Sequence, residues 1–163
     1  MDNSKPAAAL ASLQERYAPH NRCFGCGPSN DKGLRLRSLP DADGQGVVAE
    51  FRPEPHHEAF PGVVNGGIIG AILDCHSNWA AAYALMRETQ AETPPCTVTA
   101  DFHVKLKRPT PMDAVLQLKA RAIKVEGDRA LVEATLEANG KITATCTGTF
   151  IAVKEGHPAF HRW

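Results

Sequence analysis

A lone carboxylate, Asp74, stands inside a long apolar stretch that follows the triplet Asn65, Gly66 and Gly67. Burying a carboxylate is costly unless the group is paired or takes part in chemistry. Such a carboxylate can act as a base that activates water, or as a nucleophile that attacks an acyl carbon. The structural alternative is an Asp that hydrogen-bonds Asn78, which shares its face of a helix four residues on.

The glycine pair can bind negative charge if a helix begins there. The first N–H groups of a helix have no intrahelical acceptor and lie at the positive end of its dipole. With no side chains to shield them, they can stabilise a developing oxyanion by about 3 kcal/mol per donor. The alternative is a pair kept small for close packing of helix on sheet. Asn65 before them is a favourable N-cap residue, but its amide cannot transfer a proton near neutral pH.

The apolar stretch predicts one long helix over residues 66–86, about 31 Å at 1.5 Å per residue. Nearly every side of it is apolar, as expected of a helix that other structure surrounds. A membrane span is not expected, because Asp74, His76 and Asn78 fall in its middle.

Apolar and polar residues alternate along the second half of the chain, which predicts long antiparallel strands joined by tight hairpins. In the first of these strands Val98, Phe102 and Val104 are expected on the buried face and Thr99 on the opposite one. The helix is the only element available to bury the sheet, so the predicted class is α+β, with the sheet curled around the helix. The expected strands are residues 33–38, 46–52, 97–107, 114–125, 128–139 and 141–154.

The composition fits one globular domain in the cytoplasm. The chain has 163 residues, and its 18 Lys and Arg balance 18 Asp and Glu, which argues against nucleic-acid binding. Its five cysteines are expected to stay reduced, and no secretion signal is visible. We expect an N-terminal arm or short helix at residues 1–22, one domain at 23–155 and a tail at 156–163.

Cys23 and Cys26 form a Cys-x-x-Cys pair that can serve two purposes. They can act as small structural residues, or they can supply two ligands of a tetrahedral zinc site. The candidates to complete such a site are His20, His56, His57 and His76. A second Cys-x-x-Cys pair is absent, so we expect no required cofactor.

Three stretches carry a family resemblance. They are CFGCGPSNDKGLRL at residues 23–36, FPGVVNGGIIGAILD at 60–74 and TADFHVKLKRPTP at 99–111. Together they resemble the lead-in, the core motif and the following strand of hotdog-fold acyl-CoA thioesterases of the phenylacetate-pathway type. That core motif is a loop ending in His, Gly, Gly, followed by a helix with Asp or Glu nine positions after the His. Asn65 stands here where the family usually has His.

The resemblance implies a hotdog fold, with about six strands wrapped around one helix. It implies hydrolysis of an acyl-CoA to free acid and coenzyme A by a homodimer or dimer of dimers, with the acyl group bound between subunits. In this interpretation Asp74 is the catalytic base or nucleophile, Gly67 donates to the oxyanion and Asn65 positions the thioester. Arg108 is expected to meet the phosphates of coenzyme A. The other residues expected to bind substrate are Gly66, His57 and Asn78.

The sequence is compatible with two other functions. Dehydratases and hydratases of the same fold use a His next to a Phe-Pro-Gly triplet, and His57 precedes Phe60 with two residues between them. A non-catalytic acyl-CoA binding domain is the third interpretation, because Asn65 replaces the family His. A thioesterase releases free thiol, a hydratase interconverts hydroxyacyl and enoyl thioesters, and a binding domain shows no turnover.

Overall fold

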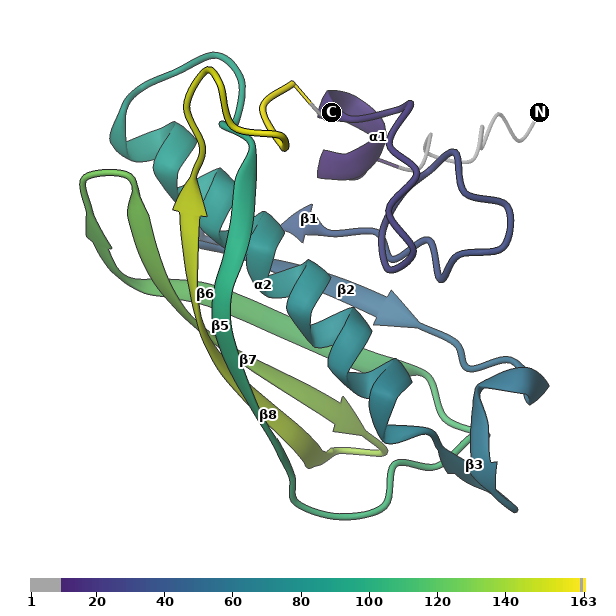
Figure 1. Cartoon of the computed structure of the whole chain (residues 1–163). Coiled ribbons are helices and arrows are strands. Elements are labelled where there is room, and N and C mark those ends of the chain that lie inside the picture. The colour runs from purple at the N-terminus through teal and green to yellow at the C-terminus, as the bar shows by residue number, and fades with distance from the viewer. Residues whose placement is uncertain (1–9, 162) are drawn as a thin grey trace, which may run out of the picture.

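One long helix, α2 (Gly66–Glu88), lies against the concave face of a six-stranded antiparallel sheet (Figure 1). The computed structural model describes residues 10–161 and 163. The sheet has the order β1-β2-β6-β7-β8-β5. Its strands are β1 (Leu39–Pro40), β2 (Gly46–Phe51), β5 (Thr97–Leu106), β6 (Leu116–Glu126), β7 (Arg129–Ala138) and β8 (Lys141–Ala152). The smaller elements are α1 (Leu13–Tyr17), the single-turn η1 (Pro55–His57) and the hairpin of β3 (Glu58–Phe60) and β4 (Val63–Val64).

Helix α2 begins where the sequence predicts and runs two residues past the expected end. Asn65 caps its first turn, and the Thr89 hydroxyl donates to the Leu85 carbonyl at 2.9 Å as the helix ends. Its buried side chains include Ile72 and Trp79, which belong to one continuous core together with buried side chains of the sheet. Within the described residues, no helix has the length and apolar character needed to cross a membrane.

The long hairpins form at the predicted turns. Gly127 joins β6 to β7 with a φ of +60°, and Asn139 and Gly140 join β7 to β8 with φ of +51° and +74°. This left-handed backbone is open to glycine and tolerated by asparagine, which is why these residue types signal tight hairpins. The turns hold β6, β7 and β8 in register, so that Leu118 and Leu136 lie opposite each other in the core.

The expected strand at residues 33–38 is wrong, because this segment is an irregular loop and the strand is confined to β1. The Leu34 and Leu36 N–H groups donate to the carbonyls of Phe24 and Gly25, at 2.7 and 3.0 Å. Arg35 between them has a φ of +50°, which no extended strand permits. The backbone N–H groups of this segment therefore bond the loop that carries Cys23 and Cys26, and not a neighbouring strand.

Strand β5 is an edge strand whose two halves present different faces to α2. Its register against β8 shifts between Thr99 and Asp101. A bulge of this kind reverses which residues point inward. Before the shift the Thr99 hydroxyl reaches α2, and after it Val104 lies opposite the buried Cys146. The expectation that Thr99 faces away from the helix is therefore wrong.

The segments at both ends of the described chain pack on the same core. Leu13 of α1 is buried and its N–H donates to the Ser38 carbonyl at 2.8 Å. Trp163 stacks on Trp79 of α2 with ring centroids 4.4 Å apart. The domain boundaries expected at residues 22 and 155 stay predictions, and residues 1–9 of the expected arm lie outside the described residues.

Candidate active site

The triplet Asn65, Gly66 and Gly67 lies at the exposed start of α2. Asn65 Oδ1 accepts hydrogen bonds from the Gly67 N–H at 2.7 Å and the Ile68 N–H at 3.3 Å. The expectation that nothing shields the glycine N–H groups is therefore wrong for Gly67. In the described part of the chain, the Gly66 N–H and the Asn65 side-chain NH2 have no hydrogen-bond acceptor. These two donors remain available to a ligand.

Asp74 lies about two and a half turns into α2. Its Oδ1 accepts a hydrogen bond from Thr99 Oγ1 of β5 at 2.7 Å. The carboxylate is half-buried, where the sequence suggested full burial. The bond from β5 holds one carboxylate oxygen, and the partial exposure leaves this side of α2 within reach of water.

Asn78 lies one turn further along α2 and bonds the neighbouring threonine of the same strand. Its side-chain oxygen accepts a hydrogen bond from the Thr97 hydroxyl, and its Nδ2 lies 3.4 Å from the Thr97 carbonyl. Thr97 is fully buried. These bonds tie α2 to the start of β5, so the expected role of Asn78 toward substrate stays a prediction.

His57 is buried beneath the loop that leads to α2, with 4% of its surface exposed. Its Nδ1 accepts from the Glu54 N–H at 3.0 Å, its ring stacks on Phe51, and its carbonyl accepts from the Asn65 N–H. Burial, and then the charge of His56, lowers the pKa of the His57 ring. The His57 backbone thus supports the N-cap residue while its ring is held in the core, and nothing in this arrangement favours the dehydratase interpretation.

Arg108 follows the end of β5 and is exposed. Its N–H donates to the Thr143 carbonyl at 3.3 Å, which fixes the backbone at the start of β8. Leu106, two residues earlier, lies over the start of α2, because a Cβ added to Gly66 would sit 3.1 Å from its Cδ1. The strand therefore delivers Arg108 to the end of the molecule where α2 begins.

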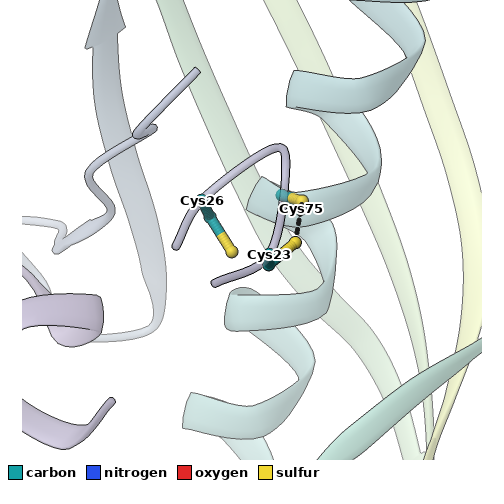
Figure 2. A group of neighbouring side chains, drawn as sticks. All are labelled: Cys23, Cys26 and Cys75. Atoms are coloured by element: carbon teal, nitrogen blue, oxygen red, sulfur yellow. Dashed lines mark hydrogen bonds between the residues drawn. The ribbon is translucent and has the colours of Figure 1, made fainter. Parts of the chain in front are cut away.

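The cysteine pair has a third member that sequence spacing does not reveal. Cys23, Cys26 and Cys75 place their sulfur atoms within 4.8 Å of one another (Figure 2). No histidine joins this group in the described residues. Hydrogen bonds from Cys26 and then Cys75 lower the pKa of the Cys23 thiol, and the same bonds to Cys23 raise the pKa values of the other two.

His76, one of the four histidines considered as a zinc ligand, is buried on the sheet side of α2. Its Nε2 lies 3.2 Å from the Val47 carbonyl and its Nδ1 lies 2.8 Å from Ser38 Oγ. A carbonyl only accepts, so Nε2 carries the proton and Nδ1 accepts from the hydroxyl. Burial lowers the pKa of His76 from 6.5 to about 4. His76 is therefore a neutral core residue.

The two ends of the expected site lie apart on α2. Asp74 lies nine positions after Asn65, about 13 Å along the axis at 1.5 Å per residue. A carbonyl under attack needs its carbon about 3 Å from the nucleophile and its oxygen about 3 Å from the oxyanion donors. Asp74 and the N–H groups of the same α2 therefore do not converge on one thioester.

Comparison with known proteins identifies the family. A family model described as Thioesterase superfamily matches residues 61–145. Acyl-coenzyme A thioesterase THEM4 of Rattus norvegicus is 24% identical over 108 residues, which are 66% of this chain and 43% of that protein. THEM4 of Xenopus laevis is 24% identical over 139 residues, with 77% of this chain and 58% of that protein covered. The chain spans about half the length of these relatives.

Solved structures share the architecture. A thioesterase superfamily protein from Shewanella loihica PV-4 superimposes with a TM-score of 0.62 at 29% identity, over 73% of this chain and 91% of that one. Zebra fish thioesterase superfamily member 2 gives a TM-score of 0.66 at 19% identity, over 89% and 100%. A putative thioesterase from Ralstonia eutropha JMP134, a phenylacetic acid degradation-related protein, gives 0.58 at 21%, over 72% and 83%.

The sheet wrapped around one helix is the hotdog fold, as the sequence predicted. The family model covers more than half of the chain. This chain belongs to the thioesterase superfamily.

Proposed function

We propose that this chain hydrolyses an acyl-CoA thioester to the free acid and coenzyme A, with Asp74 as the base or nucleophile. The observation that carries the proposal is the placement of Asp74, half-buried on α2 and hydrogen-bonded by Thr99. Family membership supports thioester hydrolysis in general. The acyl-CoA substrate is proposed from the names of the THEM4 relatives.

Asp74 can promote either of two balanced reactions. As a base, it takes a proton from water while the water oxygen bonds the acyl carbon; the C–S bond then breaks and the thiolate of coenzyme A takes up a proton. As a nucleophile, it bonds the acyl carbon and expels the thiolate, and water then hydrolyses the resulting anhydride. In both routes Thr99 is a positioning residue, because its hydroxyl holds the carboxylate by Oδ1.

The oxyanion donors are the Gly66 N–H and the Asn65 side-chain NH2. The Gly67 N–H, the donor expected from the sequence, is already bonded to Asn65 Oδ1 at 2.7 Å. Because Oδ1 points at the helix, the NH2 on the same carbon is directed away from those N–H groups. Asn65 can thus cap α2 and donate to a thioester oxygen at the same time.

The site is completed by a second copy of the chain. Asp74 and the start of its own α2 are about 13 Å apart, so the donors that meet Asp74 must come from a partner. Edge strand β5 has β8 on one side and no neighbour on the other in the described chain. Phe102 and Leu106 on it are 45% and 58% exposed, and unpaired apolar edges of this length favour pairing with another copy. We propose a homodimer at least.

Coenzyme A needs cations for its phosphates, and the end of β5 provides them. Lys105, Lys107 and Arg108 are all exposed and lie near the start of α2. The guanidinium of Arg108 matches phosphate geometry with paired N–H donors. We assign Arg108 to phosphate binding at the mouth of the site.

A second candidate is a binding domain that does not turn over. Asn65 favours it, because an amide cannot supply a proton where the resembling family has His. If the chain is instead an enzyme, Asp74 alone has to carry every proton transfer. The two candidates differ in whether thiol is released.

The test is thiol release across a panel of aliphatic and aromatic acyl-CoAs, with wild type, Asp74→Asn and the exposed control Asp113→Asn. Asp74→Asn keeps a side-chain oxygen that can accept from Thr99, so it should fold normally. We expect it to abolish turnover, while the control retains it. Near wild-type hydrolysis by Asp74→Asn would remove Asp74 from the mechanism. Acyl-CoA binding by calorimetry without thiol release from any panel member would establish the binding domain instead.

A further inference from the structure

Three thiols gather where the loop at residues 21–27 crosses α2 (Figure 2). Cys23 and Cys75 have their sulfur atoms 3.7 Å apart although they are 52 residues apart in sequence. Cys26 and Cys75 are buried, at 5% and 8% exposure, and Cys23 is half-exposed. The proposed thioesterase mechanism uses none of these side chains.

The loop backbone is shaped to bring these thiols together. The Cys23 N–H donates to Asn21 Oδ1 at 2.8 Å, and the Gly27 N–H donates to the Cys23 carbonyl at 2.8 Å. A Cβ on Gly25 would sit 2.3 Å from Cys75 Sγ, so only glycine allows the loop to approach α2 this closely. The loop and the helix turn are therefore fitted to each other at the sulfur atoms.

A polar group beside the cluster is directed at one of its sulfur atoms. Trp79 Nε1 donates to Cys26 Sγ at 3.4 Å from one turn further along α2. N–H donors stabilise the negative charge of thiolates, and outer hydrogen bonds of this kind orient metal ligands.

We propose that Cys23, Cys26 and Cys75 bind one thiophilic d10 metal ion, zinc or copper(I), through their three sulfur atoms. Zn–S bonds of about 2.3 Å in a tetrahedron place the ligand sulfurs about 3.8 Å apart. The 3.7 Å between Cys23 and Cys75 matches that edge and is far from the disulfide bond length of about 2.05 Å. Soft thiolate ligands select zinc and copper(I) over hard cations.

The coordination set is three protein ligands and one open position. Within the described residues, no histidine or carboxylate joins the three sulfurs. Zinc would take a water or a small thiol as its fourth ligand, whereas copper(I) is satisfied by three sulfurs. The half-exposed side of Cys23 provides the entry path for either ion.

The bound ion would fasten the loop to α2 next to the residue proposed for catalysis. Cys75 directly follows Asp74, but it faces the loop while Asp74 faces β5. Metal binding displaces the thiol protons and stabilises the folded chain over the unfolded one. The ion therefore has a structural role, and the proposal is independent of thioester hydrolysis.

The test is metal retention by the full chain, purified with a non-thiol reductant and incubated with one equivalent of Zn²⁺, Co²⁺ or Cu⁺. After desalting, we expect about one ion per chain by elemental analysis, a higher Tm, and thiolate-to-cobalt charge-transfer bands in the Co²⁺ sample. Retention of Cu⁺ but not Zn²⁺ identifies the ion as copper(I), and the reverse identifies zinc. Cys23→Ser and Cys75→Ser should lose the ion, while Cys96→Ser, which changes a cysteine outside the cluster, should keep it.

Alkylation of the wild type makes the test independent of how the variants fold. With metal bound, mass spectrometry should show Cys23 protected from iodoacetamide, and a chelator should restore its reactivity. The proposal is overturned if the reduced wild-type chain retains neither Zn²⁺ nor Cu⁺ and Cys23 is alkylated equally fast with and without them. Retention that survives in Cys75→Ser, folded by circular dichroism, would overturn the assignment of Cys75.

Discussion

The Thr99 hydroxyl on edge strand β5 donates a hydrogen bond of 2.7 Å to Asp74 Oδ1 on the central helix α2. Two residues earlier on the strand, Thr97 makes the equivalent bond to Asn78, one turn further along the helix. The two threonines thus tie the same strand to the same helix, Thr99 through the proposed catalytic carboxylate and Thr97 through the Asn78 amide. Variants of the two threonines can therefore distinguish the proposed positioning role of Thr99 from the structural role of Thr97.

We expect Thr99→Val to lower kcat at least tenfold, because the carboxylate loses the bond that holds it in place. Thr99→Ser keeps the hydroxyl and should retain most of the turnover. Thr97→Val removes a buried hydrogen bond, which costs about 1 kcal/mol of stability, but should leave kcat close to wild type. The measurements are thiol-release kinetics and thermal melts on all three variants. If Thr97→Val and Thr99→Val lose turnover equally, Thr99 has no special role toward Asp74.

Elements whose formation depends on their own residues could be predicted from the sequence. Asn65 caps α2 through N–H groups two and three residues on, and the turns at Gly127 and at Asn139 and Gly140 depend on their own residues, so local patterns predict all three features. The hotdog architecture followed, because one apolar helix and one antiparallel sheet have few ways to bury each other.

Features that depend on distant partners could not be predicted. The bulge after Thr99 reverses which β5 residues point toward α2, and the alternation of apolar and polar residues in the sequence does not reveal it. The bond from Thr99 to Asp74 therefore could not be predicted. Cys75 meets Cys23 from 52 residues away, and only the Cys-x-x-Cys half of that cluster has a recognisable spacing. The half-buried state of Asp74 likewise depends on an open sheet edge that the sequence does not reveal.

Asn65 is expected to cap α2 and to donate to the thioester oxygen, and its variants distinguish these two roles. Asn65→Ala removes the cap on Gly67 and Ile68 and should cost about 1 kcal/mol of stability, with at least a tenfold loss of turnover. Asn65→Asp keeps the capping oxygen but replaces the NH2 donor with an anion, so stability should hold while activity falls. Asn65→His introduces the residue usual in the resembling family and should retain activity. Asn65 is only a cap if the Ala variant melts lower but turns over normally.

Because His76 is buried and neutral, we expect the folded chain to lose stability in mild acid. Its pKa is lowered from 6.5 to about 4 by burial, so the folded chain resists a proton that the unfolded chain binds. The stabilisation is complete above pH 6.5 and is lost as the pH falls toward 4. A pKa lowered by this much corresponds to a loss of about 3 kcal/mol in the free energy of unfolding. His57, whose pKa is also lowered, adds to the same trend.

Urea unfolding of wild type, His76→Gln and the exposed control His20→Gln at several pH values checks this prediction. The fall in unfolding free energy between pH 6.5 and 4 should be smaller in His76→Gln than in wild type. The control should follow the wild-type curve. Equal slopes for wild type and His76→Gln would show that His76 does not carry the pH dependence.

The proposed shared site requires an oligomer at working concentrations. We expect sedimentation at micromolar concentration to show no 17.6 kDa monomer, because the proposed partner would cover the apolar edge of β5. Leu106→Lys, which places a charge on that edge, should shift the equilibrium toward monomer and reduce activity in parallel. A wild-type monomer that is fully active would contradict the shared site.

Mixing two inactive variants tests the shared site most directly. Gly66→Val should abolish activity, because its side chain crowds Leu106, which lies 3.1 Å from where a Cβ would stand, and blocks the N–H donor. Asp74→Asn removes the carboxylate. If each site takes its N–H groups from one subunit and its carboxylate from the other, a mixed dimer has one doubly altered site and one intact site. Random mixing makes half of the dimers mixed, so co-refolded variants should recover about a quarter of wild-type activity. If all groups came from one subunit, every site in the mixture would carry a defect and no activity would return.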